Sequence, residues 1–166
     1  MAKERIVTVQ IPPGIHHGQA VRVRGEGEVG SDAAHRGDLH CYVHVKPHPF
    51  LERDENNLLC GLPISFTQAA LGAEVEVPTL TGKASVKIPP GTQHGQHIRL
   101  RGLGLPDLRR RGTGDEIVVV QIEVPKKLNK QQQELLREFA KTEDLNVMPE
   151  SKGFFEKLVD YLGGHD

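Results

Sequence analysis

The chain has 166 residues, of which 37% are hydrophobic and 4% are aromatic. Its 21 basic and 22 acidic side chains leave a formal net charge of −1, which favours neither a nucleic-acid partner nor a membrane partner. The two cysteines, Cys41 and Cys60, form no CxxC pair, so we expect no disulfide scaffold, no metal site and no cofactor. Without an apolar leader or a run long enough to cross a bilayer, we expect a cytoplasmic protein.

An internal repeat organises the sequence. Residues 11–27 recur as residues 88–104, 77 positions downstream, and 13 of the 29 positions in 11–39 are identical in the two copies. The 18 Gly and 11 Pro residues punctuate short apolar runs, which is typical of turns between strands. The sequence therefore predicts a mostly β chain with two similar small domains of the sandwich or barrel type, the first of them incomplete.

The incomplete first β domain is expected over residues 1–47. Val7, Val9 and Ile11 alternate with polar residues, which is the period of a half-buried strand. Pro-Pro-Gly at 12–14 predicts a turn, and short strands are expected at 21–23 and 39–45. A junction is expected over 48–57. Because the hairpin that opens the second copy has no counterpart here, we expect either a truncated gene product or a piece of a longer protein.

The second β domain is expected over residues 58–127. It should begin with a strand at 58–65 and one helical turn at 66–71 that Gly72 ends. Residues 73–80 and 84–88 alternate around Thr81-Gly82, which predicts a hairpin. The repeated strand-turn unit follows, and a strand over 117–124 closes the domain.

A helical segment is expected over residues 128–166. Asn129 should cap a helix that runs through Lys141, and a second amphipathic helix should run from Ser151 to Gly163. The apolar face of the second helix is too extensive for a solvated helix. We therefore expect the second helix to pack on a partner surface, whereas the first helix could instead pack on the second β domain of its own chain.

The motifs of this sequence resemble those of the C-terminal region of DnaJ-type co-chaperones. The resemblance is carried by the strand-turn unit of 11–27, by the His-Pro-Phe-Leu-Glu-Arg-Asp junction at 48–54, and by the run from Ala69 to Gly82. It implies two β domains that bind unfolded polypeptides, a C-terminal segment that forms a homodimer, and cooperation with the 70 kDa heat-shock chaperone in protein folding and the stress response. In the zinc-containing branch, a zinc module interrupts the first domain just before the strand at Val7, which would account for the missing hairpin.

Two motifs of the complete co-chaperones do not occur in this sequence. The J domain acts through a His-Pro-Asp tripeptide, and the zinc module carries four CxxC motifs; the sequence has neither. We therefore expect this chain neither to stimulate ATP hydrolysis by the 70 kDa chaperone on its own nor to bind zinc.

The resemblance also implies which residues bind and which dimerise. It places a polypeptide-binding pocket in the first domain, on Val7, Val9, Leu39, Cys41 and Val43, although each of these could equally be a core residue. A second binding surface would involve Leu59, Leu62, Ile64 and Phe66. Dimerisation is assigned to the apolar residues of the two helices: Leu135, Leu136, Phe139, Phe154, Phe155, Leu158, Val159 and Leu162.

The alternatives to a polypeptide-binding protein come from other classes. An enzyme is disfavoured because the sequence has no GxSxG, HExxH or P-loop motif. His17 and His94 occupy the same turn in both repeats, whereas a catalytic site is rarely duplicated in this way, so no catalytic residue is predicted. The remaining alternative is a dimeric structural or assembly module, or a truncated remnant, that binds no unfolded client.

Overall fold

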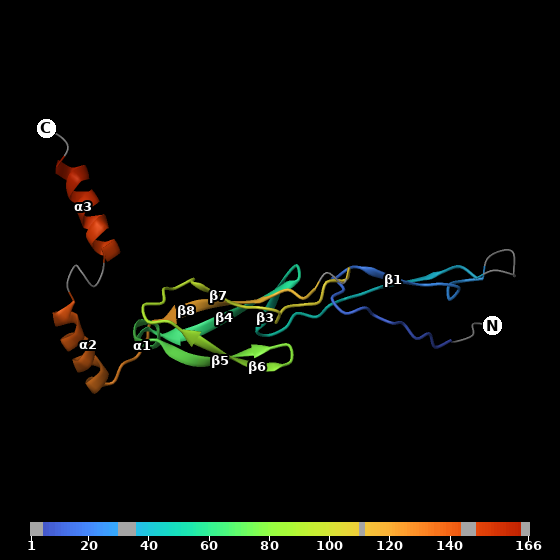
Figure 1. Cartoon of the computed structure of the whole chain (residues 1–166), viewed down its shortest axis with the longest axis horizontal. Helices are drawn as coiled ribbons and strands as arrows, with labels where there is room; N and C mark the ends of the chain where they lie inside the picture. Colours follow the sequence, from blue (N-terminus) through green and yellow to red (C-terminus); the bar gives the residue numbers. More distant parts are fainter. Residues whose placement is uncertain (1–4, 30–35, 110–111, 144–148, 164–166) are drawn as a thin grey trace. The chain divides into compact units, whose positions relative to one another are not determined.

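The computed structural model describes residues 5–29, 36–109, 112–143 and 149–163, with side chains in the last range given for 153, 154, 156–159, 161 and 162. The chain divides into two compact units, residues 1–124 and 125–166. The first unit contains the strands and a short helix: β1 (Ala20–Val23), β2 (Leu39–Tyr42), β3 (Leu51–Asp54), β4 (Asn57–Ser65), α1 (Phe66–Leu71), β5 (Ala73–Thr79), β6 (Gly82–Ile88), β7 (His97–Leu100) and β8 (Glu116–Glu123) (Figure 1). The second unit contains α2 (Lys130–Thr142) and α3 (Pro149–Gly163). The prediction of a mostly β chain with C-terminal helices is confirmed.

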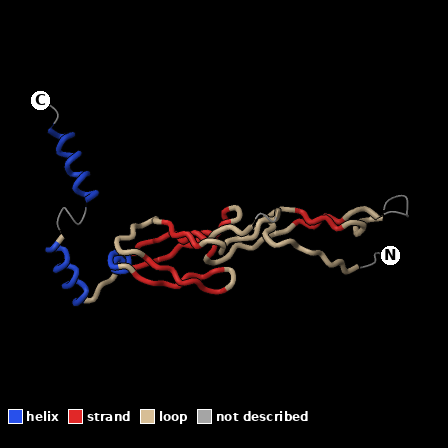
Figure 2. Tube along the Cα trace, viewed as in Figure 1, coloured by secondary structure: helices blue, strands red, loops and turns tan. Residues whose placement is uncertain are grey.

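The strands form three sheets. A four-stranded sheet has the order β3-β4-β8-β7, in which β4 and β8 are parallel and the other pairs are antiparallel. Strands β5 and β6 form an antiparallel hairpin, and β1 and β2 form a second antiparallel pair. Most of the strand length belongs to the second repeat, and the first repeat is mainly loop (Figure 2).

The hydrophobic core lies in the second repeat. Every second side chain of β4 and β8 points to one face of the sheet, and the β5–β6 hairpin packs against that face. The main cluster comprises Leu62, Ile64, Ala69, Val77, Val86, Ile88, Val118 and Val120. A smaller cluster comprises Leu51, Leu58 and Cys60 with Leu105 packed against it. In the described part of the first repeat, no apolar side chain reaches the same degree of burial.

The internal repeat has the same backbone in both copies. Gly14 and Gly91 have φ angles of 85° and 79°, and Gly18 and Gly95 both have 79°. Residues other than glycine rarely adopt these φ angles, which explains why glycine occupies both positions in each copy of the repeat. Hydrogen bonds repeat at the same offset: Gly18 N–H donates to Val43 O at 2.8 Å, and Gly95 N–H donates to Val120 O at 2.7 Å.

Several strand boundaries differ from the prediction; the strand expected at 39–45, for example, is β2 and ends at Tyr42. Residues 5–11 alternate in exposure up to Gln10 but form no strand, because no described strand lies beside them; their counterpart 82–88 is β6, which pairs with β5. Four of the ten residues of the expected junction at 48–57 form strand β3, which turns into β4 through Glu55, a residue with φ 53°.

The helices end and begin largely as expected. The N-terminus of α1 is capped by Ser65 and Gln68, and that of α2 by Asn129 and Gln132, each pair forming a reciprocal capping box. Helix α3 begins at Pro149, two residues before the predicted Ser151; proline fits the first turn of a helix because no N–H is needed there. None of the described helices is long and apolar enough to cross a membrane.

Candidate functional site

The two duplicated histidines hold the turns of the repeats. His17 accepts a hydrogen bond at Nδ1 from the backbone N–H of Val45 at 3.3 Å, and His94 accepts one from Ile122 N–H at 3.1 Å. Each imidazole therefore ties its turn to the strand that runs beside it. Each histidine has the same structural role in its repeat. This role is sufficient to explain why histidine occurs at the same position in both copies. No group of three or more His, Cys, Asp and Glu in the described residues is placed to hold a metal ion.

An aspartate locks the second turn of each repeat. Asp38 accepts from Gly25 N–H at 2.9 Å and pairs with Arg22 at 2.8 Å. Asp115 does the same in the second repeat: it accepts from Gly102 N–H at 2.8 Å and pairs with Arg99 at 3.5 Å. The outward arginines of β1 and β7 are therefore held by carboxylates of their own repeat.

The predicted pocket residues lie in positions that the second repeat buries. Cys41 and Val43 correspond at the 77-residue offset to Val118 and Val120, whose exposure is 0%. In the first repeat, Cys41 and Val43 are only half-buried. The difference has a physical cause: β8 is covered by the β5–β6 hairpin and paired with β4, whereas β2 pairs with β1 alone among the described strands.

The fold brings part of the predicted set together. Leu39 and Cys41 lie opposite Val23 and Val21 in the β1–β2 pair, and all four half-buried side chains share one face. Val21 and Val23 were not predicted as site residues, although their alternation with Arg22 places them on this face. We call these four residues the β1–β2 apolar face.

Val7 and Val9, the predicted residues of the opening segment, are not joined to this face by strand pairing in the described part of the chain. Val7 and Val9 are half-buried in the extended 5–11 segment. In the described part of the chain, the hydrogen-bonded link from this segment to the rest of the repeat is the ion pair of Arg5 with Glu26, at 2.9 Å. This segment is thus attached to the rest of the first repeat by the side chain of Arg5 and not by strand pairing.

The second predicted surface is largely wrong. Leu62 and Ile64 are core residues, with exposures of 9% and 3%. Leu59 lies on the opposite face of β4, and Phe66 is exposed at the start of α1. A strand pattern alone does not tell which of its two faces is covered, so the four residues could not be separated in advance.

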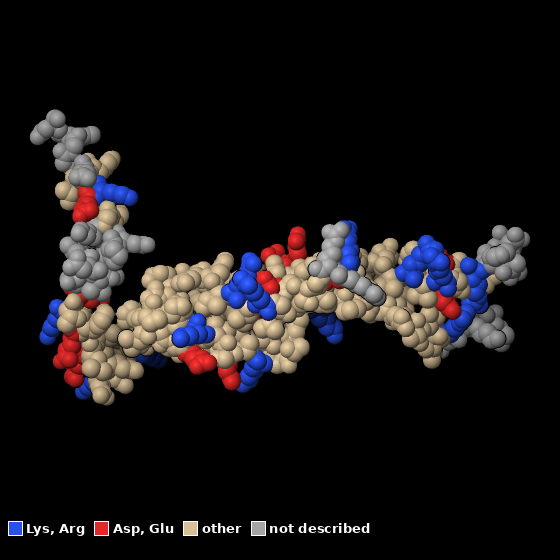
Figure 3. All heavy atoms as spheres, in the orientation of Figure 1, with Lys and Arg blue, Asp and Glu red and all other residues tan. Residues whose placement is uncertain are grey.

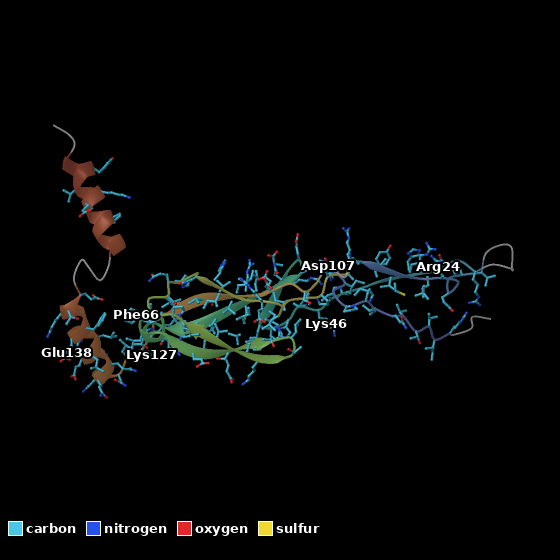
Figure 4. The ribbon with its side chains drawn as sticks, in the orientation of Figure 1. Arg24, Lys46, Phe66, Asp107, Lys127 and Glu138 are labelled. Carbon is cyan, nitrogen blue, oxygen red and sulfur yellow. The ribbon has the colours of Figure 1, made fainter. Side chains whose placement is uncertain are left out.

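A groove that was not predicted lies between the two repeats. Its volume is about 1110 Å³, and apolar side chains make most of its wall. The first repeat contributes Pro12, Pro13 and Ile15, the connecting segment contributes Val45 and 47–51, and the second repeat contributes Leu59, Leu80, Leu105 and Val119. We call this cavity the inter-repeat groove; Lys46, one of its lining residues, lies where the first repeat meets the second (Figure 4).

Arg53 joins the two sides of this groove. From β3, its guanidinium donates to Ile15 O at 2.6 Å and to Gly14 O at 2.8 Å, and Nε donates to Glu55 O at 2.6 Å. Nη2 also lies 3.0 Å from Nε2 of His16. Partial burial lowers the pKa of Arg53 from its usual value. Within the described residues this cation forms no ion pair with a carboxylate, and its contacts are the three backbone carbonyls and the His16 ring.

Charged side chains of both signs lie at the surface of the 1–124 unit. On the face drawn in Figure 3, acidic and basic side chains are interspersed over the 5–124 unit. The salt bridge of Lys83 with Glu76, at 2.8 Å, is one example, and its hydrogen bond raises the pKa of Lys83.

The C-terminal helices carry exposed apolar side chains. In α2 these are Leu135, Leu136 and Phe139, and in α3 they are Phe154, Leu158, Val159 and Leu162. The side chain of Phe155, also predicted for dimerisation, lies outside the described residues. A smaller groove of about 470 Å³ beside α2 is lined by Leu128, Leu136 and Ala140 together with Lys126 and Arg137.

Comparisons with known proteins match nearly the whole chain. The model of the DnaJ C terminal domain matches residues 1–125, and that of the chaperone protein DnaJ C-terminal region matches residues 131–162. The chain is 50% identical over 161 residues to the chaperone protein DnaJ of Acetivibrio thermocellus, covering 97% of this chain and 42% of that protein. It is 51% identical over 154 residues to the chaperone protein DnaJ of Ruminiclostridium cellulolyticum, covering 93% and 41%. The chain thus spans about two fifths of the length of the curated relatives that it matches.

Proposed function

This chain belongs to the family of DnaJ C-terminal domains, and from this premise we propose that it binds unfolded or non-native polypeptides as the C-terminal part of a DnaJ-type co-chaperone. It acts without catalysis, in the cytoplasm, and assists protein folding together with the 70 kDa heat-shock chaperone. Neither nucleic acid nor a membrane is a partner. The relatives supply the class of function, and the contacts of this chain supply the candidate surface.

One observation carries the proposal for the binding surface. Leu39 and Cys41 of the β1–β2 apolar face, together with Val43, correspond to residues 116, 118 and 120 of the second repeat, which are 0% exposed, yet all three remain half-buried. An apolar side chain of a client gains free energy by covering such a surface, at about 25 cal/mol for each Å² of apolar area removed from water. The edge of β2 that has no described partner strand also offers backbone groups to an extended client.

Suppression of aggregation tests this function. The purified chain is expected to suppress the aggregation of a heat-denatured reporter protein, and Cys41→Asp is expected to raise the concentration needed for half-suppression about tenfold, since a charge on the apolar face opposes burial of a client side chain. Tyr42→Asp is the matched control: Tyr42 is the last residue of β2, points to the other face and is 77% exposed. Thermal melts establish that both variants are folded.

Two outcomes would count against the proposal. If the wild-type chain fails to suppress aggregation, the chain does not bind non-native polypeptides. If it forms a dimer without suppressing aggregation, the alternative function holds, that of a dimeric structural or assembly module. Equal loss in Cys41→Asp and Tyr42→Asp would remove the β1–β2 apolar face as the site.

We also propose that the chain is a homodimer, formed through the apolar faces of α2 and α3. Exposed Leu135 and Leu162, at 58% and 70%, support this reading because large apolar side chains of a helix are normally covered. A twofold interface presents the same face from each chain, so a dimer displays two copies of each polypeptide-binding surface.

A further inference from the structure

The inter-repeat groove is large, and most of its wall is apolar. Its volume of about 1110 Å³ exceeds the range of roughly 300–1000 Å³ that is typical of small-ligand pockets. Three of its apolar lining side chains are large and exposed: Ile11 at 58%, Phe50 at 66% and Leu80 at 52%. A surface of this kind, facing solvent in a single chain, is typical of a site that receives a partner.

The walls of the groove indicate how a partner is held. Pro12, Pro13, Pro47 and Pro49 line it, and proline has no backbone N–H to donate. A ligand strand added along these walls would therefore find no backbone N–H donor at the four prolines. The groove is suited to ligands whose side chains are buried against Phe50, Leu80 and the prolines, and not to ligands recognised through their backbone.

The charges at the groove select between ligands of opposite sign. Lys46 and Arg53 line it with Glu52 as the acidic residue among the lining side chains. The guanidinium of Arg53 donates to carbonyl oxygens and forms no ion pair with a carboxylate among the described residues, so a negative group entering the groove meets a cation that is partly desolvated. Charge complementarity thus favours an acidic ligand over a basic one.

We propose that the inter-repeat groove binds an extended apolar segment of a polypeptide that is flanked by acidic side chains. This inference rests on the proposed function and adds to it a second binding surface, distinct from the β1–β2 apolar face. The segment lies with its apolar side chains against Phe50, Leu80 and the prolines, and its carboxylates lie near Lys46 and Arg53.

Two fluorescein-labelled peptides with the same Leu-Val-Phe core, one with Asp flanks and one with Lys flanks, test the proposal by fluorescence polarisation. The wild-type chain is expected to bind the Asp-flanked peptide more tightly. The double variant Phe50→Ser/Leu80→Ser is expected to lose about tenfold in affinity for it, the size of a modest hot spot. Leu71→Ser is the matched control, since Leu71 is 79% exposed at the end of α1 and does not line the groove. Serine is used so that no new charge confuses the comparison.

A charge change gives an independent readout. Lys46→Glu is expected to reverse the preference of the chain from the Asp-flanked to the Lys-flanked peptide, and thermal melts show whether each variant folds. The groove proposal is overturned if Phe50→Ser/Leu80→Ser binds both peptides as the Leu71→Ser control does, or if Lys46→Glu leaves the preference unchanged. If the wild-type chain binds neither peptide and suppresses no aggregation, the proposed function itself fails. If the wild type suppresses aggregation and Cys41→Asp alone removes that activity, the function stands and the groove is not part of it.

Discussion

Glu116 stands in the second repeat where Leu39 stands in the first. Its exposure is 0%, and neither carboxylate oxygen has a hydrogen-bond partner in the described residues. Burial raises the pKa of Glu116; burial, and then the charge of Glu116, raise the pKa of the Cys60 thiol. A buried carboxyl without a partner is unfavourable, and more so when it is ionised. This side chain therefore lowers the stability of the second repeat near neutral pH.

Glu116→Leu, which copies the residue of the first repeat, is expected to raise the free energy of unfolding at pH 7 by about 1–3 kcal/mol. The folded state holds the proton of Glu116 more tightly than the unfolded chain does. The wild type therefore loses stability as pH rises from the ordinary glutamate pKa, roughly 4.3, to the raised pKa of the folded state. Urea unfolding at pH 4 and pH 7 should show the larger gain at pH 7.

The control for this substitution is Glu123→Leu, because Glu123 is exposed on the same strand. Its effect on the free energy of unfolding should be small, because substitutions at exposed positions usually change stability little. A Glu116→Leu variant that is less stable than the wild type at pH 7 would contradict the interpretation, since it would mean that the carboxylate has a partner in solution.

The sequence predicted the repeated glycine and histidine positions but not the burial of Glu116. Gly14, Gly91, His17 and His94 recur at one offset, and a turn that needs positive φ explains why glycine is kept. A glutamate at the start of a strand is normally exposed, so pattern analysis assigned Glu116 to the loop. The one indication of its burial was that it aligns with the apolar Leu39 in the first repeat, and one aligned position is too little to predict burial.

The Pro-Pro-Gly turn is docked differently in the two repeats. In the second, Gly91 and Thr92 donate their N–H groups to Ala69 O at the end of α1, at 2.9 and 3.1 Å. In the first, the carbonyl oxygens of the turn accept from Arg53, and Gly14 lies against Pro106 O so closely that a Cβ would clash with it. The same turn motif thus attaches helix α1 in the second repeat. In the first repeat it attaches that repeat to the second.

Arg53→Lys is expected to lower the free energy of unfolding of the chain by about 1–2 kcal/mol, because one ammonium cannot replace the three carbonyl contacts of the guanidinium. Urea unfolding followed by far-UV circular dichroism measures this. Arg99→Lys is the matched control, since Arg99 is exposed and its ion pair with Asp115 is long at 3.5 Å. Equal losses in the two variants would show that Arg53 does not hold the repeats together.

The sequence predicted the helices and strands whose capping or turn residues lie within or next to the element itself. The capped helices α1 and α2 and the β5–β6 hairpin form where their local residues require them. The 5–11 segment and β3 were missed for the opposite reason. A strand exists only with a partner, and the alternation of Val7 and Val9 says nothing about whether one is present. The inter-repeat groove depends on two segments far apart in sequence, so no local pattern could show it.

The functional surfaces of the molecule are divided between its two units. The 1–124 unit contains both proposed polypeptide-binding surfaces, and the 125–166 unit contains the apolar helix faces. Two copies joined through those faces would offer a long client several contacts at once. The gain in affinity then comes from effective concentration and needs no new contact.

The double variant Leu135→Asp/Leu162→Asp is expected to be a monomer, because burying two carboxylates at an apolar interface costs more than the interface gains. The mass of one chain is 18.3 kDa. Sedimentation should give twice this mass for the wild type and the mass of a single chain for the variant. Gln131→Asp is the matched control, as it adds a charge to α2 at an exposed polar position. The monomer should still bind the short Asp-flanked peptide with unchanged affinity but should suppress aggregation less well for each chain, since avidity is lost. A double variant that sediments as a dimer would show that the chains associate through another surface.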